Sequence, residues 1–134
     1  TWAPNTVTWT GNNRTHMVRV PGPGRFELRL PDGATNPYLL QAVIIAAGIH
    51  GLETNADPGK RYDIDMYAEG YKVKGAPKLP LNLLDALRIF DRDKALKESL
   101  GIEFSNAFLK LKHEEWTSFC SHFSSWEKEN TLDI

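Results

Sequence analysis

This sequence lacks several features that would assign it to a specialised class of proteins. Its 134 residues include one cysteine, Cys120, which excludes an internal disulfide and a thiolate metal site. The formal net charge is −1, whereas general nucleic-acid or membrane-surface binders usually carry a strong positive excess. The apolar run after Gly33 is too short to span about 30 Å of hydrocarbon. We therefore expect a globular chain in a reducing, cytoplasmic compartment, with no nucleic-acid or membrane partner.

The positive charge that is present is concentrated near the start of the sequence. Before Gly33 there are no lysines, and arginines outnumber the two acids, Glu27 and Asp32. The arginines are Arg14, Arg19, Arg25 and Arg29. Arginine alone suits fixed, forked contacts to phosphate or carboxylate oxygens. Like charges this close are unfavourable unless an anion or a metal-bound anion lies between them, so the cluster indicates phosphate chemistry.

Residues 25–30 alternate charged and apolar side chains, which predicts a strand with one polar and one apolar face. The charged groups Arg25, Glu27 and Arg29 then project from one face, roughly 7 Å apart at alternate residues. Taken alone, this pattern is also typical of a surface ion-pair ladder, and a simple anion-binding module is a further reading. The upstream arginines and the glycine-bearing connector at 21–24, where backbone can approach a ligand closely, favour a site.

The remaining pattern predicts an α+β fold in which a few antiparallel strands precede a helical region. Strands are expected at 6–9, 16–20 and 26–30, within a strand region at 1–32. Asn36 and Pro37 are typical of a helix start, and the apolar stretch that follows predicts a buried helix over 36–51. Residues 53–80 have no sustained period and read as a long loop excursion of functional or subunit-contact type. Residues 81–134 read as helical.

Within the helical region we expect helices at 81–91 and 93–100, then one long helix from a Ser105 cap to about Lys128. Cys120 lies among aromatic residues and is expected to be a buried small hydrophobe. His16 has no second ligand at a useful spacing, so a structural histidine is favoured over a metal ligand. The sequence has no initiator Met and opens in a strand-and-turn pattern, from which we expect a fragment of a longer protein.

Three motifs in fixed order resemble the glutamine synthetase catalytic domain. They are NNRTHMVRVP, RFELRLPD and NPYL, and the likeness continues through Asp57-Pro58-Gly59 and Met66-Tyr67 to LNLLDALRIFDRD. The resemblance covers nearly the whole chain and implies the C-terminal part of that domain, 1–134. The end, SSWEKENTLDI, is similar to the branch with bacterial glutamine synthetase-like enzymes and γ-glutamylmethylamide synthetases. Tyr67 lies near a tyrosine that some members adenylylate, but DMYAEG lacks the usual flanks.

The resemblance implies an ATP-dependent ligase of nitrogen metabolism that joins ammonia or a small amine to glutamate through γ-glutamyl phosphate. By position, Arg14 matches the arginine on the transferred phosphoryl group, and Arg29 matches the one that holds glutamate or its acyl phosphate. Arg19 and Arg25 match arginines on the nucleotide phosphates. Glu27 matches a ligand of an active-site magnesium or manganese ion.

The resemblance also implies a homo-oligomeric ring, commonly a dodecamer, whose active sites need upstream carboxylates and a histidine. We therefore expect this chain alone to be inactive. A non-catalytic, glutamine synthetase-like protein with a structural or regulatory role is the alternative. Retention of Glu27 among the four arginines disfavours it, because a protein without catalysis has no physical need for a metal carboxylate there.

Overall fold

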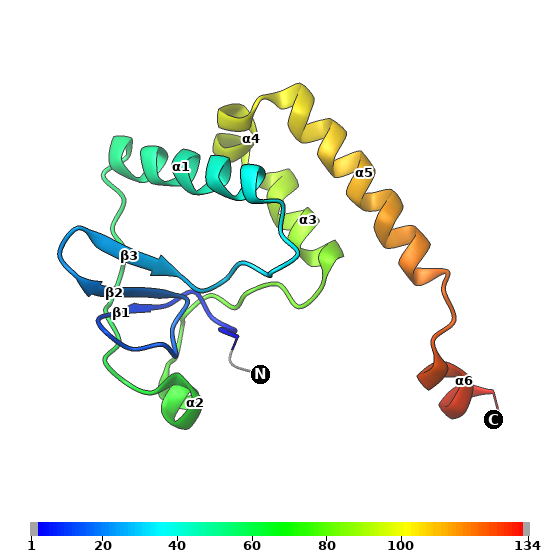
Figure 1. Cartoon of the computed structure of the whole chain (residues 1–134), viewed down its shortest axis with the longest axis horizontal. Helices are drawn as coiled ribbons and strands as arrows, with labels where there is room; N and C mark the ends of the chain where they lie inside the picture. The colour runs from blue at the N-terminus through cyan, green and yellow to red at the C-terminus, as the bar shows by residue number, and fades with distance from the viewer. Residues whose placement is uncertain (1–2, 133–134) are drawn as a thin grey trace. The chain divides into compact units, whose positions relative to one another are not determined.

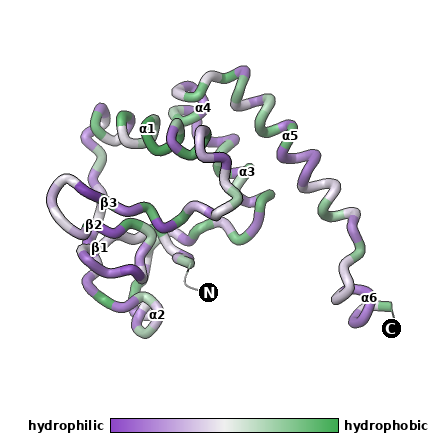
Figure 2. Tube along the Cα trace, viewed as in Figure 1, coloured by the Kyte–Doolittle hydropathy of each residue, from purple (hydrophilic) through white to green (hydrophobic). Residues whose placement is uncertain are grey.

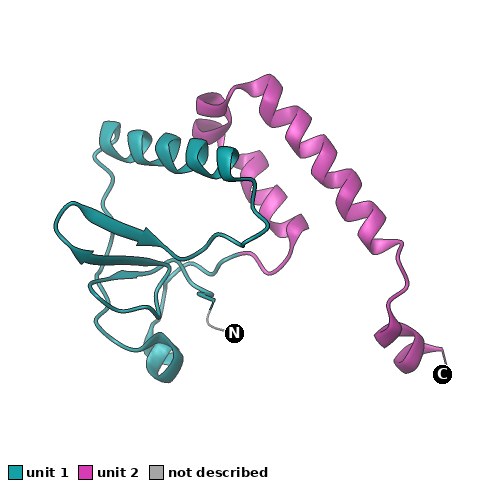
Figure 3. Cartoon of the chain, viewed as in Figure 1, with its two compact units in different colours: residues 1–79 teal, residues 80–134 magenta. Residues whose placement is uncertain are grey.

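The computed structural model describes residues 3–132 and divides into two compact units. Unit 1 comprises residues 1–79 and unit 2 residues 80–134 (Figure 3). Unit 1 contains the sheet and the arginine cluster, and unit 2 is helical. The α+β composition expected from the sequence is confirmed.

Unit 1 is built on a three-stranded sheet in the order β1–β2–β3 (Figure 1). The strands are β1 (Trp9–Thr10), β2 (Val18–Gly22) and β3 (Arg25–Leu28). The expected antiparallel pairing is confirmed for β2 and β3 but is wrong for β1, which runs parallel to β2. Residues 11–17 are not a hairpin turn: their polar side chains bond to the backbone at 64–66, so the chain returns to the start of β1 before it enters β2.

The connector between β2 and β3 is shorter than the expected 21–24 turn, because Gly22 still pairs with Arg25. The reversal occurs at Pro23 and Gly24, and Gly24 takes the left-handed φ of +70° that favours glycine. The pairing shifts register between Arg19 and Gly22, which marks a bulge in β2. On the other side of this bulge, Arg19 pairs directly with Glu27.

Helix α1 (Pro37–Glu53) begins where the sequence predicts it. The Asn36 side chain accepts hydrogen bonds from the backbone N–H groups of Tyr38 and Leu39, at 3.0 and 3.1 Å. The helix is hydrophobic along its length (Figure 2), yet none of its residues is buried. The expected burial is therefore wrong within this chain, because none of the other described elements of unit 1 packs along it. No described helix is long and apolar enough to cross a membrane.

The long excursion after α1 returns to the sheet and contains two short elements, α2 (Met66–Glu69) and η1 (Gly70–Lys72). The Tyr62 N–H donates to the Trp9 carbonyl at 3.1 Å, and Thr6 forms an antiparallel bridge with Lys78. The excursion is thus an ordered part of unit 1.

Unit 2 consists of α3 (Leu83–Arg92), α4 (Lys94–Leu100), α5 (Ile102–Cys120) and α6 (Ser125–Thr131). Helices α3, α4 and α5 pack on one another around the buried Leu87 and Leu109. The rings of Phe90 and Phe108 meet edge to face with centroids 6.1 Å apart.

Two expectations for unit 2 are wrong. The long helix from Ser105 is instead two helices, because Gly101, with φ of +92°, precedes α5 and a capping box between Ser124 and Glu127 starts α6. Ser105 is buried within α5 and donates to the Lys97 carbonyl at 3.2 Å. Cys120 is exposed at the end of α5, since the described chain places no cover over it.

Candidate active site

The centre of the candidate site is the Glu27 carboxylate, which lies between two guanidinium groups. The direct pairing of β2 with β3 brings Arg19 beside Glu27, and the Arg19 Nη1 donates to Glu27 Oε2 at 2.7 Å. Arg29 Nε lies 3.4 Å from Glu27 Oε1. The Arg19, Arg29 and Glu27 side chains are 11%, 17% and 32% exposed, so all three are partly shielded while the carboxylate is still reachable. Ordinary strand register thus assembles a fixed arginine–carboxylate–arginine row.

Arg19 has a second partner, Asn12, to which the sequence pattern assigned no role at the site. The Asn12 side-chain carbonyl accepts from Arg19 Nε at 3.0 Å and also from Nη2. Two acceptors on different sides of one guanidinium fix its plane. The Asn-Asn-Arg stretch of the first motif was the signal for this role.

Arg29 lies just after β3, where its backbone N–H still donates to the Met17 carbonyl at 2.8 Å. Its Nη1 donates to the Arg14 carbonyl and, at 3.5 Å, to the His16 carbonyl. The guanidinium is therefore held by backbone carbonyls of the 14–16 segment as well as by Glu27. This places the Arg14 backbone directly beside the row.

The guanidinium groups of Arg14 and Arg25 differ from these two. Both residues are exposed, and no hydrogen bond or ion pair to either guanidinium is found among residues 3–132. The structure brings Arg19, Glu27 and Arg29 into contact and leaves the other two guanidinium groups open to solvent. Four arginines against one carboxylate within residues 14–29 leave a clear positive excess, which suits an anionic ligand.

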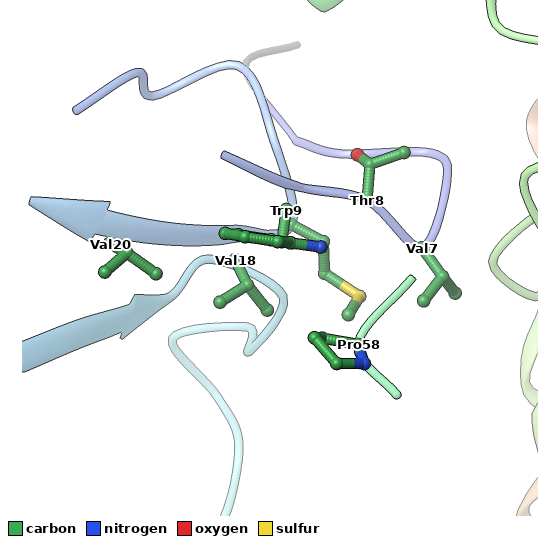
Figure 4. Close-up of a pocket in the computed structure, with 7 residues that line it drawn as sticks. Val7, Thr8, Trp9, Val18, Val20 and Pro58 are labelled. Atoms are coloured by element: carbon green, nitrogen blue, oxygen red, sulfur yellow. The ribbon is translucent and has the colours of Figure 1, made fainter. Parts of the chain in front are cut away.

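The other face of β2 carries no such chemistry. Val18 and Val20 line an apolar cavity of about 430 Å³ together with Trp9 and Pro58 (Figure 4). The Trp9 indole N–H donates to the Gly59 carbonyl at 3.0 Å, which holds the excursion against this cavity. The strand therefore separates a charged surface from an apolar one.

A neighbouring carboxylate, Asp63, belongs to the support of the site and not to the row. The Arg61 guanidinium, at 2.8 Å, is the main reason that the pKa of Asp63 lies below its usual value, and the Thr10 hydroxyl at 3.1 Å adds to it. Within the described part of the chain, no three His, Cys, Asp or Glu side chains gather at metal-ligand distance. Glu27 can supply one hard oxygen ligand to a divalent cation.

A family model described as glutamine synthetase, catalytic domain, matches residues 1–131. This chain belongs to the glutamine synthetase family. Two relatives show the range of names within it. A glutamine synthetase of Rhizobium leguminosarum bv. phaseoli is 75% identical over 134 residues, covering 100% of this chain and 31% of the relative. A glutamate–methylamine ligase of Methyloversatilis universalis is 41% identical over 142 residues, covering 100% of this chain and 30% of the relative.

Solved structures agree with this membership. A GmaS/ADP complex superposes with a TM-score of 0.93 at 57% identity, over 99% of this chain and 30% of that one. A GmaS structure without ligand gives the same TM-score over 98% of this chain. The resemblance to the glutamine synthetase and methylamide synthetase branch is therefore confirmed. The chain spans about a third of the length of the relatives that it matches.

Proposed function

We propose that this glutamine synthetase-family chain forms part of the active site of an ATP-dependent ligase. The reaction joins ammonia or a small amine to the γ-carboxylate of glutamate through γ-glutamyl phosphate. The observation that carries the proposal is the Glu27 carboxylate held between Arg19 at 2.7 Å and Arg29 at 3.4 Å. Phosphoryl transfer requires positive charge placed beforehand around the transferred group, and such a row supplies it.

The four arginines divide into held and open groups, and we propose a role for members of both groups. Arg19 and Arg25 bind the nucleotide phosphates, and Arg14 contacts the transferred phosphoryl group. The exposed Arg14 and Arg25 have no competing partner in the described residues, so an anion meets no ion pair that must first be broken. Arg29 holds glutamate or its acyl phosphate with a guanidinium fixed by Glu27 and by two carbonyls.

Glu27 is the one residue of the row that can bind a cation, and we propose magnesium or manganese. Its oxygens are the hard ligands that these ions prefer, and the carboxylate is one-third exposed. A bound divalent cation would neutralise charge on phosphate oxygens. Arg19 and Arg29 orient the carboxylate in the way that outer-shell partners orient metal ligands.

The assembled protein is proposed to be a homo-oligomeric ring, a dodecamer, located in the cytoplasm. Large apolar side chains remain exposed on unit 2, including Phe119 at 69% and Trp126 at 67%. Exposed apolar side chains of this size suit a subunit interface. The exposed thiol of Cys120 is compatible with a reducing compartment.

The test uses the full-length protein with ATP, magnesium and glutamate, and offers ammonia and methylamine in parallel. We expect release of ADP and phosphate together with glutamine or γ-glutamylmethylamide, measured by mass spectrometry. The 134-residue chain alone should give neither product. Absence of both products from the full-length protein would overturn the proposal, and turnover by the isolated chain would overturn its incompleteness.

The variant Glu27→Gln separates a ligase from a simple anion-binding site. If Glu27 binds a metal, the variant weakens metal-dependent nucleotide binding by roughly tenfold or more, because one charged ligand is lost. If the arginines merely bind anions, removal of a negative charge tightens the binding of inorganic phosphate without metal. Isothermal titration with and without magnesium distinguishes the two results.

A further inference from the structure

A set of buried polar side chains lies behind the arginine row. This polar seam consists of Thr8, Thr10, Thr15 and His16 on one side and the backbone and Asp63 carboxylate of residues 63–66 on the other. The four side chains are between 0% and 9% exposed, and His16 and Thr10 are fully buried. No buried side-chain nitrogen or oxygen among the described residues lacks a hydrogen-bond partner.

His16 is the largest fully buried side chain of the described chain, and both of its ring nitrogens are bonded. Nε2 lies 3.0 Å from the Ile64 carbonyl, and Nδ1 lies 3.0 Å from the Thr8 hydroxyl. Because a carbonyl only accepts, Nε2 carries the hydrogen, and in the neutral ring Nδ1 accepts from the Thr8 hydroxyl. The ring therefore joins the segment just before β1 to the excursion at Ile64.

Two further bonds connect residues 13–15 to the same excursion. The Asn13 amide donates to the Ile64 carbonyl at 2.9 Å, and the Met66 N–H donates to the Thr15 hydroxyl at 2.9 Å. Residues about fifty positions later in the sequence thus fix the backbone of residues 13–16. Directional bonds in a buried place define position more narrowly than apolar contact does.

The same short segment presents its carbonyls to the row. The Arg14 and His16 carbonyls both accept from Nη1 of Arg29, whose Nε faces Glu27. Thr8 and Ile64 thus hold the His16 ring, and the backbone carbonyl of His16 contacts the Arg29 guanidinium. Arg19 takes no part in these contacts, since its hydrogen-bond partners are Asn12 and Glu27.

We propose that His16 is a positioning residue for Arg29, and that its buried ring sets where this guanidinium meets the substrate. The inference rests on the proposed ligase function for its kinetic consequence, but the placement of Arg29 can be measured without any turnover. A merely structural His16 would affect the whole unit. A positioning His16 affects Arg29 and leaves the nucleotide side unchanged.

Three variants of the full-length protein test the two hydrogen bonds of the His16 ring separately. His16→Gln places an amide nitrogen near the position of Nε2 and keeps the donor to Ile64. His16→Asn reaches only the position of Nδ1 and keeps the link to Thr8. His16→Ala removes both, and His113→Ala, an exposed histidine on α5, is the matched control.

The first measurement is the rate at which phenylglyoxal modifies Arg29, followed by peptide mass spectrometry. We expect His16→Asn and His16→Ala to raise this rate about fivefold, a change comparable to one lost hydrogen bond. His16→Gln and His113→Ala should leave it near the wild-type rate. Modification of Arg88, an exposed arginine on α3, gives the reference in each sample. An unchanged Arg29 rate in His16→Asn overturns the proposal, and so does an equal rise in His16→Gln.

The second measurement is steady-state kinetics of the same variants. We expect His16→Asn to lower kcat roughly tenfold to a hundredfold, since a small misplacement of a binding group is costly, while the KM for ATP stays within about twofold. His16→Gln should recover most of kcat. A KM for ATP that rises as much as kcat falls would overturn the positioning role. A wild-type protein without ligase turnover would overturn the proposed function alone, because the labelling result still decides the placement of Arg29. If His16→Ala does not fold, the Gln and Asn variants retain both tests.

Discussion

Different kinds of contact stabilise the interiors of the two units. The buried side chains of unit 1 are polar and hydrogen-bonded, with Thr10 and His16 fully inaccessible. Unit 2 instead buries two leucines, Leu87 and Leu109, and one hydrogen-bonded polar residue, Ser105. Its Phe108 ring packs on the rings of Phe90 and Phe104. Hydrogen bonds specify direction and distance, whereas apolar packing specifies mainly volume. The unit that presents the arginine row is therefore the one whose interior fixes positions most narrowly.

Arg29→Lys gives the largest expected effect, because it keeps the charge and removes only the geometry. We expect kcat/KM of the full-length protein in the proposed ligase reaction to fall roughly 10²–10³-fold, since a lysine cannot contact Glu27 and two carbonyls with one planar fork. Steady-state kinetics with varied glutamate measures it. Arg88→Lys on α3, whose ion pair with Asp85 is exposed, should change activity by less than about twofold. A fully active Arg29→Lys variant would show that the geometry of this side chain matters no more for activity than that of Arg88 in unit 2.

Leu109→Ala comes next and tests the apolar side of the comparison. Leu109 is 7% exposed, so its truncation should lower the free energy of unfolding by roughly 2–4 kcal/mol. Leu109→Met should cost less than about 1.5 kcal/mol, because volume is nearly conserved. Urea unfolding followed by circular dichroism measures both. The exposed Leu111 provides the matched control, and a Leu111→Ala variant as unstable as Leu109→Ala would contradict the assigned core.

The smallest effect concerns one directional contact of unit 2, the capping box of α6. The Ser124 hydroxyl at 2.6 Å and the Ser124 N–H at 2.8 Å hold the pKa of Glu127 below its ordinary value of 4.5. A lowered pKa in the folded state means that the carboxylate stabilises α6 above about pH 4.5 and that this contribution is lost as the pH falls further.

Hydrogen exchange of residues 125–131, corrected for intrinsic rates and referred to the amides of α5, should show reduced protection at about pH 3 relative to neutral pH. Ser124→Ala should remove most of this pH dependence. Equal protection of α6 at both pH values in the wild type would contradict the capping role.

Local sequence patterns predicted the elements whose causes lie within a few residues. The alternation at 25–30 predicted β3, Asn36 and Pro37 predicted the start of α1, and the amphipathic stripe at 81–91 predicted α3. The break between α5 and α6 also had a local signal, Ser124 followed by Glu127 at the spacing of a capping box, and it was missed.

Features that depend on distant residues could not be predicted from the same patterns. The parallel pairing of β1 follows from bonds between residues 13–16 and 64–66, about fifty positions apart. The exposure of α1 and Cys120 depends on which surfaces lie opposite them, and no local pattern contains that information. For the site, the sequence predicted four arginines around Glu27, and the structure brings Arg19 and Arg29 into contact with it. The bond from Arg19 to Asn12 required the folded turn. The roles of the four arginines and of Glu27 all stay predictions.

The bulge in β2 has a consequence for how this fold can tolerate insertions. It lies between the Arg19–Glu27 pair and the reversal at Pro23 and Gly24. A longer or differently composed loop tip would change the twist and the strand pairing between the bulge and the tip. The Arg19–Glu27 pair, on the other side of the bulge, would keep its register. The tip is therefore a segment where length can vary during evolution, or be altered by an engineer, without moving the carboxylate from its arginine.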